Sequence, residues 1–116
     1  MLTVHHVVAF LVLATCFGAA ATGFLAYRRA VAGQAVAHLL ALAQTVVVAQ
    51  VALGLLLLSG GRRAPDQLHY AYGTFALLAV LAPWLYAPAE PRRRLAWFAA
   101  ATLVAGALGV RAYMTA

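Results

Sequence analysis

The sequence predicts an all-α protein, an integral membrane bundle of four helices that run up and down. Three observations lead to this fold class. Of the 116 residues, 66% are hydrophobic and only 9% are charged, whereas a soluble domain carries about 25% charged residues. The hydrophobic residues form four segments, each near the roughly 20 residues that cross a bilayer. Only short segments separate them, so no loop is long enough to form a second domain.

Turn and cap residues predict where these helices begin and end. Pro65 and Asp66 precede the third apolar segment, and Pro suits a first helical turn while Asp caps it. Pro83 falls near the end of the same segment, where it should kink the last turn. We therefore expect a single transmembrane domain over residues 1–116, with helices at about 4–27, 35–58, 66–86 and 95–114.

The charged residues predict the partner and the orientation. The eight cations are all Arg, and two acidic residues leave a net charge of +6. The Arg residues fall in short runs between apolar segments, a pattern typical of loops at lipid headgroups, so we expect a lipid bilayer as partner and no nucleic acid. Five Arg residues fall on the side of the first and third loops and three on the opposite side. Because Arg favours the cytoplasmic side, this split predicts a multi-pass protein with both termini outside.

Cys16 is the only cysteine, so the sequence excludes an intrachain disulfide and a dithiol redox motif. Its surroundings, Leu-Ala-Thr-Cys, resemble a lipoprotein processing site. However, no Lys or Arg precedes the first apolar segment, and a cleaved signal peptide has a positive start. We therefore expect this segment to stay in the protein as a helix, with Cys16 as a small packed side chain.

Rows of small residues predict where the helices pack. Lipid tails are as apolar as Leu, so helices in a bilayer associate through close backbone contact at such rows. We expect both of the following rows to contact another helix. The first segment carries Ala9, Val12, Cys16, Ala19 and Gly23 at helical spacing, and the last carries Ala101, Ala105 and Gly109.

Polar side chains in the second segment are the next candidates for function, because polar groups inside a membrane are costly. Gln44 and Gln50 are six positions apart, which places them on different helix faces at 100° per residue. They therefore predict hydrogen bonds to helices on both sides rather than one pathway. No acidic residue lies in mid-membrane, which argues against a proton-coupled exporter, although a small-solute transporter that uses Gln and His stays an alternative.

Residues 66–73, with the sequence DQLHYAYG, gather one of two acidic residues and one of four histidines in a short stretch. His69 falls in the first turn of the third helix. The first helix runs in the same direction and begins with His5 and His6, so these imidazoles should lie at similar depth. His5 continues into the row of small residues, whereas His6 continues into a row of Phe residues. Gly73, one turn below His69, leaves room for a flat ligand.

Two kinds of cofactor site fit this pattern. A b-type haem would take His69 and His5 as axial ligands, with Gly73 in the slot and cations near the haem propionates. Alternatively, imidazoles and a carboxylate would bind a Cu or Zn ion. The expected haem site comprises His69, His5, Gly73, Arg62, Arg63 and Arg111. The expected metal site comprises His69, His5, His6 and Asp66.

A resemblance adds to these observations. The segments QVALG (residues 50–54), RAPD (63–66) and LHYAYG (68–73) resemble a group of small bacterial four-helix membrane proteins with an R-A-P-D-x-L-H-Y-x-Y-G stretch. That resemblance implies the same fold in a bacterial inner membrane. The region is also distantly similar to one four-helix half of haem A synthase, where a Gln-Val-x-Leu-Gly helix precedes an apolar helix with Leu-His. Haem-binding histidines of that family come from the second and fourth helices of each half, and only His69 carries over.

Three functions follow as hypotheses. The first is a structural, accessory or assembly subunit or a homo-oligomer, in which Asp66 caps a helix and Tyr70 and Tyr72 anchor it at the headgroups. The alternative is an electron-transfer protein with a haem, quinone or metal site at the outer side. The second alternative is the small-solute transporter. We do not expect an enzyme, because Asp66 and Glu90 fall on opposite sides of the bilayer.

Overall fold

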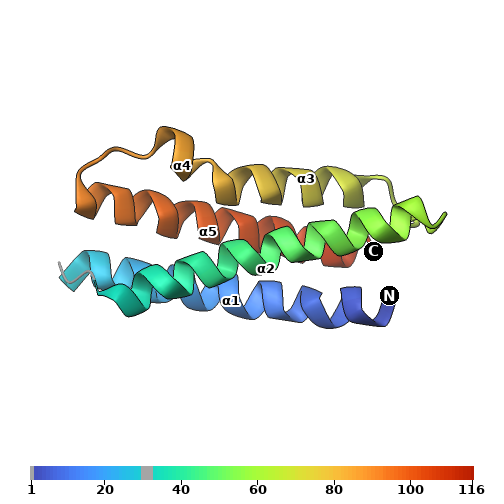
Figure 1. Cartoon of the computed structure of the whole chain (residues 1–116), viewed down its shortest axis with the longest axis horizontal. Helices are drawn as coiled ribbons and strands as arrows, with labels where there is room; N and C mark the ends of the chain where they lie inside the picture. Colours follow the sequence, from blue (N-terminus) through green and yellow to red (C-terminus); the bar gives the residue numbers. More distant parts are fainter. Residues whose placement is uncertain (1, 30–32) are drawn as a thin grey trace.

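The computed structural model describes residues 2–29 and 33–116. In its described part each long helix runs antiparallel to the long helix before it (Figure 1). They are α1 (Leu2–Arg29), α2 (Gln34–Ser59), α3 (Leu68–Leu81) and α5 (Pro91–Met114), with the one-turn α4 (Pro83–Tyr86) between α3 and α5. The all-α class is confirmed. Among the described residues, four stretches are long and apolar enough to cross a membrane: Leu2–Arg29, Gln34–Ser59, Leu68–Tyr86 and Pro91–Met114.

The helices pack in a definite order. α1 lies along both α2 and α5, and α5 also lies along α3, whereas α2 and α3 touch each other far less. Both termini, the end of α2 and the start of α3 lie at one end of the bundle, the right-hand end of Figure 1. Among neighbouring long helices, α2 and α3 are therefore the least closely packed pair.

Small residues hold α1 and α5 together, as their spacing predicts. A Cβ atom at Gly23 would lie 2.9 Å from Cβ of Ala99, and one at Gly106 would lie 3.1 Å from Cβ of Cys16. A Cβ atom at Gly109 would lie 3.5 Å from side-chain carbons of α1. The α1 row is thus confirmed as a packing face, with Ala9 half-buried and its other members buried. The α5 row is confirmed only in part: Ala105 is buried and Gly109 approaches α1, whereas Ala101 is half-buried and the closest contacts come from Ala99 and Gly106.

The start of α5 differs from the prediction. This helix begins at Pro91, four residues before the predicted start, because the carboxylate of Glu90 accepts hydrogen bonds from the backbone N–H groups of Arg92 (3.0 Å) and Arg93 (2.8 Å). These donors would otherwise lack partners at a helix start. The Arg run at 92–94 therefore belongs to the first turn of the helix rather than to the loop.

α3 is shorter than predicted at both ends. It begins at Leu68, whose N–H donates to the Asp66 carboxylate over 2.9 Å, so Asp66 caps the helix from just outside it. At the other end Pro83 interrupts the helix, and a separate turn, α4, follows. The amide of Gln44 spans this break: its Nε2 donates to the Val80 carbonyl (3.4 Å) and its Oε1 accepts from Trp84 Nε1 (2.9 Å). The predicted role of Gln44 as a link between helices is confirmed.

Candidate functional site

A cavity of about 570 Å³ occupies the end of the bundle where both termini lie. The first turns of α1 and α3, the last turns of α2 and α5, and the loop between α2 and α3 line it. Its volume falls within the range of about 300–1,000 Å³ that is typical of small-molecule sites. Most lining side chains are apolar, and the polar ones include His5, His69 and Gln50.

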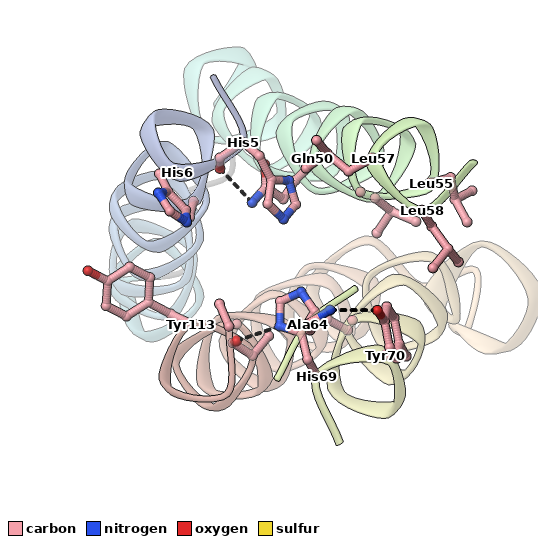
Figure 2. A pocket seen from close by; sticks show the side chains of 18 of the residues that line it. His5, His6, Gln50, Leu55, Leu57, Leu58, Ala64, His69, Tyr70 and Tyr113 are labelled. Carbon is pink, nitrogen blue, oxygen red and sulfur yellow. Dashed lines mark hydrogen bonds between the residues drawn. The ribbon is translucent and has the colours of Figure 1, made fainter. Parts of the chain in front are cut away.

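His5 and His69 face each other in this cavity. Their ring centres are 6.2 Å apart, and the ring planes meet at 76°. Figure 2 shows the two imidazoles pointing toward one another from α1 and α3, which are opposite helices of the bundle. The sequence thus correctly predicts that histidines from these two helices lie at the same depth.

The ring of His69 has a defined orientation. Its Nδ1 lies 2.7 Å from the carbonyl oxygen of Ala112 in the last turn of α5. A carbonyl oxygen only accepts, so Nδ1 carries a proton, and in the neutral ring Nε2 then keeps its lone pair. Next to it, the hydroxyl of Tyr70 accepts from the N–H of Ala64 over 2.8 Å, which ties the α2–α3 loop to α3. One turn below, a Cβ atom at Gly73 would meet no atom within 4 Å, so the expected open slot exists.

His5 is buried, and α2 supports it. A Cβ atom at Gly54 would lie 3.3 Å from Cε1 of the His5 ring, so the missing side chain makes room for the imidazole. One helical turn earlier, Gln50 Nε2 donates to the backbone carbonyl of His5 over 2.9 Å, which confirms Gln50 as a link between α1 and α2. Nδ1 of His5 is buried and has no hydrogen-bond partner among the described residues. Nε2 of the same ring is not fully buried, so it is the nitrogen accessible from the cavity.

The other predicted site residues divide into two groups. Arg62 and Arg63 line the cavity, and the Arg63 guanidinium also donates to the carbonyl of Leu58 (2.8 Å) at the end of α2. Arg111 does not line it. That exposed side chain lies on the outer face, with its guanidinium 5.6 Å from the ring centre of Tyr72. Two of the three expected cations are therefore at the cavity.

The predicted four-residue metal set does not come together. His6 is exposed at the cavity rim, and the Asp66 carboxylate is exposed and caps α3. Within residues 2–29 and 33–116, no three His, Cys, Asp or Glu side chains gather closely enough to hold a metal ion. The geometry instead brings two imidazoles together across a cavity.

Sequence reasoning missed three contributors to this site. They are the carbonyl of Ala112, which orients His69, Gly54, which accommodates His5, and the position of Gln50 beside the cavity. A signal existed for two of them, because Gln50 and Gly54 are four residues apart and so share one face of α2. No protein-family model, curated protein or solved structure matches this chain.

Proposed function

We propose that this chain is a membrane protein that binds one b-type haem between His5 and His69 and carries electrons. The observation that supports it best is the spacing of the two imidazoles. A histidine nitrogen binds zinc at about 2 Å, and the centre of the imidazole ring lies roughly 1 Å further away. Two imidazoles that bind one metal ion from opposite sides therefore have ring centres roughly 6 Å apart. Their ring centres are 6.2 Å apart.

The donor set favours haem over a bare metal ion. A tetrahedral Zn site needs about four ligands, whereas a porphyrin supplies four equatorial nitrogens itself and needs only axial ligands from the protein. Two facing imidazoles meet that need. The Nδ1–H of His69 donates to a backbone carbonyl, the arrangement that holds metal-binding histidines in the correct tautomer.

The cavity also suits the shape and charge of haem. Its apolar lining and the open space at Gly73 accommodate a flat hydrophobic ring. Arg62 and Arg63 supply positive charge at the cavity for the propionate carboxylates. Two axial histidines would leave no free position on the iron, which favours electron transfer over chemistry on a bound substrate.

We propose further that the chain lies in a bacterial inner membrane with both termini outside. Five Arg residues in the last turn of α1 and the first turn of α5, against three at the other end of the bundle, support this orientation. The haem would then lie near the outer surface. A periplasmic reporter fused after Ala116 should be active; activity only of a cytoplasmic reporter at that position would contradict the orientation.

Absorption spectroscopy tests the proposed function. The chain, produced in cells that make haem and purified in detergent, should show a Soret band. The His69→Ala variant should lose it, the His5→Ala variant should change it, and the His6→Ala variant should keep it. A colourless wild-type protein that also fails to bind added hemin would leave the accessory-subunit hypothesis in its place.

A further inference from the structure

Only one end of the Gln50 side-chain amide makes a hydrogen bond to the described residues. Its Nε2 donates to the backbone carbonyl of His5 over 2.9 Å. Its Oε1 is buried and has no hydrogen-bond partner among the described residues. A buried polar atom without a partner destabilises the folded protein, so this oxygen needs an explanation.

His5 can supply the donor that Gln50 Oε1 lacks. Nδ1 of His5 is also buried without a partner, and the residue that carries it already contacts Gln50 through its backbone. Gln50 Oε1 is an acceptor, and His5 Nδ1 is a donor in one of the two imidazole tautomers. A hydrogen bond between these two atoms, direct or through one bridging water, would satisfy both at once.

We infer that Gln50 is a positioning residue for His5: its Oε1 accepts a hydrogen bond from His5 Nδ1–H and so keeps Nε2 unprotonated toward the cavity. This inference rests on the proposed haem site, because a histidine ligand must present a lone pair to the metal. Both imidazoles would then be in the Nδ1–H tautomer, each held by a different hydrogen-bond acceptor. The carbonyl of Ala112 holds His69, and the side chain of Gln50 holds His5.

The chain offers a matched control. Gln44 lies on the same helix and is buried, whereas Gln50 is half-buried, and the amide of Gln44 contacts Val80 and Trp84 instead of His5. Replacing either glutamine with Leu removes one interhelical amide from α2. Only the change at Gln50 should alter the imidazole of His5.

The first readout needs no haem. Nitrogen NMR of the haem-free protein with labelled histidines, assigned with the His5→Ala variant, reports the tautomer of His5. The wild type and the Gln44→Leu variant should show His5 as the Nδ1–H tautomer. The Gln50→Leu variant should shift His5 toward the Nε2–H tautomer. The Gln50→Glu variant, which keeps an acceptor, should retain the wild-type tautomer and covers the case in which Gln50→Leu does not fold.

The second readout is the affinity for added hemin. Loss of a hydrogen bond behind a metal-binding histidine typically weakens binding by about 10–100-fold, which is the loss expected for Gln50→Leu but not for Gln44→Leu. The inference is overturned if His5 keeps one tautomer in all variants, or if Gln44→Leu changes it as much as Gln50→Leu does. If hemin does not bind to the wild type, the proposed function fails, while the tautomer measurement still decides the role of Gln50.

Discussion

Gly54 of α2 lies directly against the ring of His5, and a Cβ atom there would be 3.3 Å from Cε1 of the imidazole. The spacing is tighter than ordinary van der Waals contact, so any larger residue at this position must displace the ring. The absence of a side chain at Gly54 therefore helps to set the position of His5 across the cavity from His69.

The first prediction concerns this contact. The Gly54→Leu variant should push the His5 imidazole away from the axial position while His69 stays in place. We expect hemin binding to weaken at least about tenfold, as for other groups that orient a metal ligand, and the bound haem to become high-spin. A hemin titration followed at the Soret band measures both effects.

Gly18 provides the control for this substitution. It lies on the exposed face of α1, and a Cβ atom there would meet no atom within 4 Å. The Gly18→Leu variant should bind hemin like the wild type. Equal losses in the two variants would show that leucine harms the bundle in general, and the proposed role of Gly54 would be wrong.

The second prediction concerns the packing of α1 on α5. A Cβ atom at Gly23 would lie 2.9 Å from Cβ of Ala99, so the Gly23→Ala variant must separate the two helices. Overpacking of this kind costs about 1–3 kcal/mol. The Gly18→Ala variant has free space and should gain up to about 1 kcal/mol from its higher helix propensity. Unfolding in detergent, followed by circular dichroism, should show that Gly23→Ala is less stable than the wild type and that Gly18→Ala is more stable.

The third prediction concerns the pH dependence of the α5 start. The N–H groups of Arg93 and Arg92 stabilise the carboxylate and hold the pKa of Glu90 below its usual 4.5. A group with a lowered pKa in the folded state contributes stability that is present above the unfolded pKa and is lost as the pH falls through the folded pKa. The stability advantage of the wild type over Glu90→Gln should therefore be constant above pH 4.5 and shrink below it.

Acid titration of the unfolding free energy of both proteins measures this difference. The side chain of Gln does not titrate, so any pH dependence of the difference reports on Glu90. An advantage that is the same at about pH 3 as at about pH 7, on either side of the ordinary Glu pKa, would contradict the capping role.

The sequence predicts the large features of this molecule because they follow from periodicity. Apolar segment lengths predict the four spans, and the row of small residues that continues from His5 predicts that His5, rather than His6, is buried. The depth of His5 and His69 follows from the parallel direction of the first and third helices. These features depend on spacing along one helix at a time.

What the sequence does not predict depends on contacts between segments. The partner of His69 is a backbone carbonyl at Ala112, and every residue has one, so no pattern distinguishes it. Arg111 lies outside the cavity, beside the Tyr72 ring, and its side of α5 follows from how that helix is rotated against its neighbours. The early start of α5 had a signal that we missed, because Glu90 followed by Pro91 is typical of a helix start.

Electron paramagnetic resonance of the ferric, haem-loaded protein tests most directly whether His5 and His69 bind the same iron. Two imidazole ligands make the iron low-spin, and the 76° angle between the two rings predicts the highly anisotropic low-spin signal of nearly perpendicular ligand planes. The His5→Ala variant should become high-spin, and His6→Ala should not change the signal. A high-spin signal in the wild type, or a low-spin signal that survives in His5→Ala, would contradict the shared site.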